Sequence, residues 1–316
     1  MATDVSKQES STISLKKPLK SKQEKKRIYW AYLFILPQLI FFLVFTIYPI
    51  VMSYVYSAYE WSGIGPLTNF VGLDNFVRLF QDPRFWNAFG NTFIYMIGVT
   101  ILLMPTSLVL AIILNNVLTK SSVFYRTIYF LPVVASTAVV GLVLRQVFGD
   151  DGAVNEILMG LGIIDKPHSW LGHSVSAMVI VILVGAWKFF GMMMVYWLAG
   201  LQTIPKDVIE AAKIDGANFW HLTRHVILPI LAPIALVILL LCVTSSLHVF
   251  DLVKTLTDGE PYYSTDMIDL FVYRKAFDPQ EGLPAMGYAS AAGVIFGIIT
   301  LAIALGLSWI AKRKQL

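Results

Sequence analysis

The chain has 316 residues, of which 57% are hydrophobic and 14% are charged, and its formal net charge is +4. A water-soluble globular domain would carry roughly a quarter charged residues, so the composition excludes that class. The single cysteine, Cys242, excludes an internal disulfide. The small positive charge is no reason to expect a nucleic-acid partner, because its distribution along the chain has another explanation.

The first 27 residues contain eight Lys or Arg side chains and precede the first long apolar run. A run that begins this late and is this long does not fit a cleavable signal peptide. We therefore expect residues 1–27 to form a basic, disordered cytoplasmic tail. Residues 28–316 are then expected to form one transmembrane domain.

A helix needs about 20 mostly apolar residues to cross the core of a bilayer. Six segments meet this requirement, roughly 29–57, 88–114, 126–148, 174–200, 227–250 and 285–311. The sequence therefore predicts an all-α transmembrane fold of about six spanning helices, in which Pro105 and Pro132 are expected to kink or delimit helices. In the last segment, Gly293 and Gly297 form a G-x-x-x-G pattern that would allow close helix contact.

The segments between the predicted spans alternate in charge. Loops 58–87, 149–173 and 251–284 together hold six Lys or Arg against fourteen Asp or Glu. The two tails and the other loops hold sixteen against six. Basic residues concentrate on the cytoplasmic side of membrane proteins, so both termini and the 201–226 loop are predicted to face the cytoplasm.

That cytoplasmic loop contains helix-starting and helix-ending residues that are unusual in a simple connection between two spans. Pro205 is suited to begin a short helix, which carries Glu210, Ala211 and Ala212, and Gly216 permits the positive φ that ends it. Small side chains allow another backbone to approach closely. The segment is about 26 residues long, whereas connections average about 4–6, so we interpret it as a surface for a soluble partner.

The spacing from Glu210-Ala211-Ala212 through Gly216 to Leu228-Pro229 resembles the EAA loop of permease subunits of bacterial ABC importers. Val226 stands where the pattern has Ile. The resemblance implies that loop 201–229 docks on an ATP-hydrolysing subunit. It assigns coupling to these residues: Glu210, Ala211, Ala212, Asp215, Gly216, Leu228 and Pro229.

Further stretches resemble carbohydrate-uptake permeases of the maltose and glycerol-3-phosphate type. They are Trp30–Pro37, Phe70–Phe76, Leu198–Pro205, Phe250–Val253 and Leu256–Pro261, the last departing from the family pattern at Asp258 and Glu260. The resemblance implies a type I importer permease fold in the bacterial cytoplasmic membrane. It also implies a second homologous permease, two ATPase subunits that bind ATP and Mg²⁺, an external solute-binding protein and a carbohydrate cargo, with no cofactor and no catalytic residue in this chain.

Lys188, near the middle of the fourth apolar segment, is too costly to face lipid. It either joins Trp187, Phe189 and Phe190 in a sugar site, where a cation would also suit an acidic sugar, or it forms an ion pair or a hydrogen bond to a helix carbonyl. In the fifth segment, Ser245 and His248 are three residues apart and would share a helix face. The predicted substrate pathway comprises Trp187, Lys188, Phe190, Ser245, Ser246 and His248.

Two other classes remain as alternatives. An ion-gradient-driven transporter would place acidic relay residues within its spans, and the six apolar segments contain no Asp or Glu. An enzyme would need convergent acid, base or metal-binding groups. His221 and His225 alone do not make a zinc site, so we predict no metal. Among importers, a phosphate ester or an amino acid remains an alternative cargo.

Overall fold

The structure is a computed structural model that describes residues 22–116, 122–279 and 282–313. The described residues form helices and loops, with an isolated antiparallel bridge between Tyr59 and Phe70. The helical elements are α1 (Lys22–Phe42), η1 (Leu43–Ile47), α2 (Tyr48–Ser57), α3 (Asp74–Gln81), α4 (Pro83–Asn116), α5 (Ser122–Val134), α6 (Thr137–Val147), α7 (Ala153–Gly160), α8 (Ser174–Leu201), α9 (Lys206–Ile214), α10 (Phe219–Leu222), η2 (Thr223–Ile227), α11 (Leu228–Ser246), α12 (Phe250–Leu256), α13 (Ile268–Phe277) and α14 (Met286–Arg313). Here η denotes a π-helical turn.

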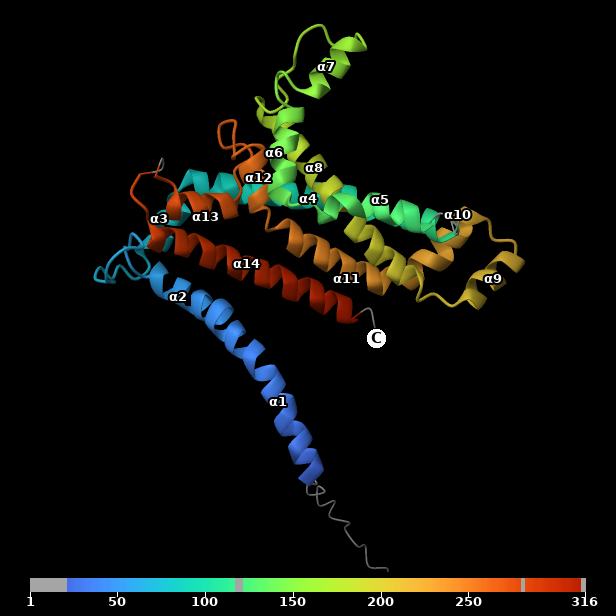
Figure 1. Cartoon of the computed structure of the whole chain (residues 1–316), viewed down its shortest axis with the longest axis horizontal. Helices are drawn as coiled ribbons and strands as arrows, with labels where there is room; N and C mark the ends of the chain where they lie inside the picture. The colour runs from blue at the N-terminus through green and yellow to red at the C-terminus, as the bar shows by residue number, and fades with distance from the viewer. Residues whose placement is uncertain (1–21, 117–121, 280–281, 314–316) are drawn as a thin grey trace, which may run out of the picture. The chain divides into compact units, whose positions relative to one another are not determined.

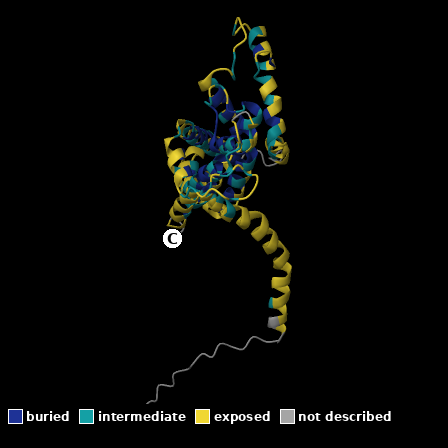
Figure 2. Cartoon of the chain, turned by 90° about the vertical axis from the view of Figure 1, so that its left-hand side faces the viewer, coloured by how far each residue is buried: buried dark blue, intermediate teal, exposed yellow. Residues whose placement is uncertain are grey.

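The chain divides into two compact units, residues 1–52 and 53–316. In the first unit, residues 29–51 of the helical run that begins with α1 are exposed (Figure 2). The predicted tail lies outside the described residues up to position 21, and Lys22–Arg27 already belong to α1. The first predicted span is confirmed as a long apolar helix, Lys26–Ser57, with a π-helical turn in its middle.

Four further helices are long and apolar enough to span a membrane: Pro83–Asn115, Ser174–Leu201, Phe219–Ser246 and Met286–Arg313. They correspond to predicted spans two, four, five and six. In the second unit, α4 packs along α8, and α11 packs against α4, α8 and α14. Figure 1 places α9 at the end of these long helices opposite α3 and α13. Such an arrangement separates the two sets of connecting segments by the length of the helices.

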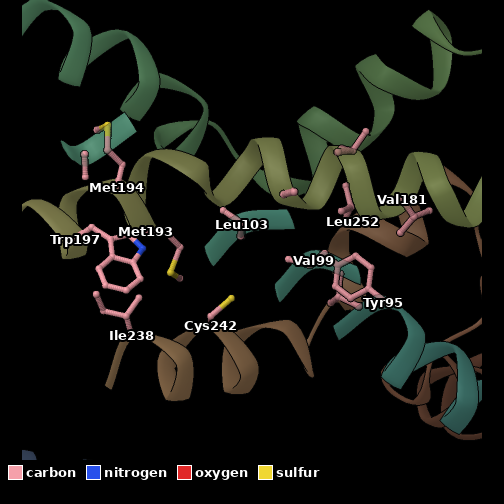
Figure 3. Close-up of a cluster of buried hydrophobic side chains, with 14 of the residues drawn as sticks. Tyr95, Val99, Leu103, Val181, Met193, Met194, Trp197, Ile238, Cys242 and Leu252 are labelled. Atoms are coloured by element: carbon pink, nitrogen blue, oxygen red, sulfur yellow. The ribbon is translucent and has the colours of Figure 1, made fainter. Parts of the chain in front are cut away.

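The main apolar core lies where α4, α8 and α11 meet. Figure 3 shows side chains from these helices converging there, among them Tyr95, Met193, Trp197 and Ile238. Trp197 is 2% exposed and Ile238 is 2% exposed. A second core joins α3, the start of α4, α13 and α14, and it is centred on Phe85 and Phe271. The two cores fix the long helices relative to the short helices α3 and α13.

The loop between α12 and α13 is held by polar contacts. Asp258, where the sequence departs from the family pattern, accepts a hydrogen bond of 2.9 Å from Lys254 Nζ. The buried guanidinium of Arg274 donates to the backbone carbonyl of Asp258. The side chain of Asn91 on α4 donates to the carbonyls of Tyr263 and Asp266, each at 3.0 Å. This loop is therefore fixed to both α13 and α4.

Candidate functional site

The third apolar segment is broken. The span predicted over 126–148 consists of α5 and α6, which are joined at Ala135-Ser136 with a bend of 92° between them. Pro132 lies in the last turn of α5, and a proline removes a backbone hydrogen bond and disfavours continuation of the helix. The expectation that Pro132 kinks or delimits a helix is therefore confirmed, and the described residues give six spans if this bent pair is counted as one.

Lys188 on α8 contacts the end of α5. Its Nζ donates a hydrogen bond of 3.0 Å to the carbonyl oxygen of Val133, and the residue is 2% exposed. The carbonyls of a final helical turn lack helical partners and carry partial negative charge, so a buried ammonium is well placed there. Of the alternatives left open for Lys188, the structure shows the hydrogen bond to a helix carbonyl.

A second break follows the fifth span. α11 ends at Ser246, and Val249 has φ −132° and ψ 27°, so the chain leaves the helix before α12 begins. The expectation that Ser245 and His248 share a helix face is therefore wrong, because the helix stops between them. Ser245 is exposed and Ser246 is 7% exposed, and neither lines the cavity described next.

The two breaks flank a cavity of about 240 Å³. Its walls come from the start of α6, the middle of α8, the chain from the second break into α12, and α13. The lining residues are Thr137, Phe189, His248, Val249, Phe250, Asp251, Leu252 and Asp269. Aromatic and aliphatic faces thus alternate with a hydroxyl, an imidazole and two carboxylates, a composition typical of small-molecule sites.

The imidazole of His248 faces the carboxylate of Asp269 in this cavity. His248 Nδ1 lies 3.4 Å from both oxygens of Asp269. The hydrogen bond to Asp269 raises the pKa of His248 above its usual value, and partial burial opposes this only in part. The pair therefore favours a protonated imidazole next to an ionised carboxylate.

Two of the cavity residues, Phe189 and His248, were predicted from the sequence to lie near the substrate. Lys188 is turned toward Val133, and its neighbour Phe189 takes the lining position instead. Asp251 and Asp269 were not predicted as site residues, because their approach to the cavity depends on how α12 and α13 fold back after α11. The break after Pro132 was the signal that Thr137 could reach a cavity.

Trp187 and Phe190 line a different cavity. It has a volume of about 470 Å³ and lies between α4, α5 and α8, with walls that are mostly apolar. The other lining residues are Leu102, Thr106, Ile128, Tyr129, Pro132, Leu183 and Ala186. Of the predicted pathway residues, His248 thus lines one cavity, Trp187 and Phe190 line another, Lys188 makes a buried hydrogen bond, and Ser245 and Ser246 line neither cavity. Among the described residues, no group of three or more His, Cys, Asp or Glu is placed to hold a metal ion.

The predicted short helix in the loop after α8 is confirmed as α9, Lys206–Ile214. Pro205 precedes it as the N-cap residue instead of occupying its first turn. Gly216 has φ +83°, and its N–H bonds the carbonyl of Lys213 at 3.1 Å. The side chain of Asn218 then accepts a hydrogen bond of 2.8 Å from His221 N and begins the next helix. The glycine and the cap together fix the turn between the two helices.

The surface of α9 has two faces. Ile209 and Ala212 pack against the main core, so the small size of Ala212 serves contact within the chain. Glu210 and Ala211 are exposed, and Ile214 is 85% exposed. An apolar side chain this accessible at the edge of a charged helix is available to a partner.

Leu228 and Pro229 lie within a continuous helix and not in a loop. The helix runs without interruption from Phe219 through the π-helical turn η2 into α11, so the connection is shorter than the predicted loop 201–229. A π-helical turn alters the hydrogen-bond ladder just before Pro229, where a missing N–H is tolerated. Leu228 is 40% exposed on this continuous helix.

Long apolar helices, two of them ending in breaks around a polar cavity, define a helical membrane-transport subunit. A charged, partly apolar helix protrudes from one end of it. The sequence profile of the family described as "binding-protein-dependent transport system inner membrane component" matches residues 84–315. The chain belongs to this family.

Relatives match over nearly the whole length of the chain. The lactose transport system permease protein LacF of Rhizobium radiobacter is 33% identical over 299 residues, covering 93% of this chain and 98% of the relative. The arabinooligosaccharides transport system permease protein AraP of Bacillus subtilis is 33% identical, covering 87% and 86%. A crystal structure of a bacterial ABC transporter that imports the acidic polysaccharide alginate contains a similar chain. It has a TM-score of 0.79 and 27% identity, with coverage of 92% and 98%.

Proposed function

We propose that this chain is the membrane permease subunit of an ATP-driven importer that moves a carbohydrate, in particular an oligosaccharide, into a bacterial cell. It would work with a second homologous permease, two ATPase subunits that bind ATP and Mg²⁺, and an external solute-binding protein. The observation that carries this proposal is the exposed face of α9 with Gly216 at φ +83°, in a chain of this family.

The packing suggests how a displacement of α9 would be transmitted to the cavity. Ile209 and Ala212 rest on the same core as Leu201 at the end of α8 and Leu222 at the start of the fifth span. A displacement of α9 therefore acts on both spans at once. α8 carries Phe189, and the fifth span leads into His248, so movement of these helices would open the cavity to alternate sides.

A carbohydrate cargo is supported by the cavity and by the names of the relatives, which refer to lactose and arabinooligosaccharides. Phe189 and Phe250 present aromatic surface, and Asp251 and Asp269 present hydrogen-bond acceptors for hydroxyl groups. A phosphate ester would find no Lys or Arg among the residues that line this cavity.

The proposed orientation can be tested with cysteine labelling, because Cys242 is the chain's single cysteine and is buried. In a Cys242→Ala background, Asp215→Cys in the turn after α9 should react with a membrane-impermeant maleimide only after the cells are opened. Asp165→Cys in the loop after α7 should react in intact cells. Labelling of Asp215→Cys from outside would overturn the orientation.

The function itself is tested with the complete importer in proteoliposomes, measuring sugar uptake and ATP hydrolysis together. Ile214→Glu on α9 should abolish both, because it places a charge in the proposed contact with the ATPase. Ile163→Glu is the matched control, since Ile163 is also an exposed isoleucine, at 63% against 85%. Normal activity of the Ile214→Glu variant would show that α9 is not part of the coupling surface. Uptake of amino acids or phosphate esters without sugar uptake would contradict the carbohydrate cargo.

A further inference from the structure

The charged groups around the His248 cavity are mostly negative. Two carboxylates, Asp251 and Asp269, line it, and His248 supplies the only ionisable nitrogen among its lining residues. The imidazole is directed at Asp269, 3.4 Å away. In the part of the chain that the structure describes, the Asp251 carboxylate has no ion-pair partner within 4.0 Å. The wall therefore offers a ligand more negative than positive charge.

Three basic residues on the helices that line the cavity, one each on α8, α12 and α13, are directed at other groups of the protein. Lys188 Nζ bonds the Val133 carbonyl and lies 5.5 Å from the centroid of the Phe189 ring, on a residue that is almost fully buried. Lys254 on α12 is 2.9 Å from the carboxylate of Asp258. Arg274 on α13 also bonds Asp258. Each of these three basic groups is thus already paired with an acceptor of the protein itself.

We propose that this cavity selects neutral sugar residues and rejects uronic acids. This inference rests on the proposed function and adds the charge class of the cargo. An ionised carboxylate only accepts hydrogen bonds, so Asp251 and Asp269 are suited to hydroxyl groups. The carboxylate of a uronic acid would instead meet two like charges, and such juxtaposition is unfavourable.

The aromatic side chains are consistent with this assignment. Phe189 and Phe250 lie among the cavity walls, and the negative faces of aromatic rings favour the C–H surface of a sugar over an anion. Thr137 adds a hydroxyl that can donate or accept. The cavity thus combines apolar faces with acceptors for hydroxyl hydrogens, and its only positive group is held by Asp269.

The test uses the assembled permease–ATPase complex in nanodiscs without the solute-binding protein, so that only the membrane part selects the ligand. Saturation-transfer NMR at pH 7 would compare maltotriose with a mannuronate trisaccharide at equal concentration. We expect a clear signal for the neutral sugar and a signal about fivefold weaker for the uronate. The Asp251→Asn/Asp269→Asn double variant should raise the uronate-to-neutral ratio by about the same factor.

Asp165→Asn is the matched control, because it removes an exposed external carboxylate far along the chain from the cavity segments. It should leave the ratio unchanged. A uronate signal as strong as the neutral one in the parent complex would overturn the proposal without any variant. An unchanged ratio in a double variant that still assembles would overturn it too. Absence of binding by either sugar would instead contradict the proposed carbohydrate function, so the two failures can be told apart.

Discussion

Lys188 Nζ donates a hydrogen bond of 3.0 Å to the carbonyl oxygen of Val133, and this contact joins the middle of α8 to the end of α5. It lies next to the 92° bend between α5 and α6. The next residue on α8, Phe189, lines the cavity that Thr137, the first residue of α6, also lines. The buried cation therefore stabilises the backbone geometry on which the cavity wall depends.

Loss of this contact should destabilise the bend. In Lys188→Met the Val133 carbonyl is left without its partner, which costs about 1–3 kcal/mol, and the cation near the helix C-terminus is also lost. Lys188→Arg retains a donor and a charge and should lose less. Thermal unfolding of the purified complex measures this, with Lys166→Met in an exposed loop as the control. Equal melting temperatures for Lys188→Met and the parent would show that the contact contributes nothing.

The packing of α5 on α8 predicts an asymmetry between two helical glycines. A Cβ at Gly191 would lie 2.2 Å from the backbone oxygen of Tyr129, whereas a Cβ at Gly293 meets nothing within 4 Å. Gly191→Ala should therefore force α5 away and cost about 1–3 kcal/mol. Gly293→Ala should be neutral or slightly stabilising.

Thermal unfolding of the two glycine variants in the same detergent is the measurement. Gly293 and Gly297 of the predicted G-x-x-x-G pattern make no close contact with the described part of this chain. If Gly293→Ala proved the more damaging of the two in the assembled complex, that face of α14 would have to contact another subunit.

Gly216 should be sensitive to backbone conformation alone. It has φ +83°, and a Cβ there would meet no atom within 4 Å, so any cost comes from the left-handed backbone, about 1–2 kcal/mol for a non-glycine residue. We expect ATP-driven uptake to decrease in the order Gly216→Asn, Gly216→Ala, Gly216→Val, because Asn tolerates this region best. Equal uptake by the Asn and Val variants would contradict this argument.

The His248–Asp269 pair predicts a pH dependence. The hydrogen bond to Asp269 raises the pKa of His248, so the parent imidazole keeps its proton to a higher pH than a free histidine. Asp269→Asn should lower that pKa, and between the two values the parent is protonated while the variant is neutral. NMR titration of histidine-labelled complex, with His248→Gln to assign the signal, measures both. An unchanged pKa in Asp269→Asn would show that the 3.4 Å contact is not made in solution.

Several elements of this protein follow from local sequence alone. Spans such as 174–200 and 285–311 were predicted to within a few residues, because length and hydropathy suffice to define a membrane helix. The short helix α9 and the positive φ of Gly216 were also predicted, since helix propensity and a glycine stop are properties of neighbouring residues. The resemblance to importer permeases depended on the same kind of local pattern, the spacing of small, glycine and proline residues around α9.

What the sequence could not determine depends on contacts between distant segments. Pro132 indicated a disturbance, but the 92° bend depends on how α5 packs on α8 at Gly191 and on the Lys188 hydrogen bond. Hydropathy likewise could not show that α11 stops at Ser246 or that Asp269, 21 residues beyond His248, returns to face it. Whether an intramembrane cation meets a ligand or a carbonyl is decided by which acceptor the tertiary packing brings within 3 Å or so of it, and no local pattern encodes that distance.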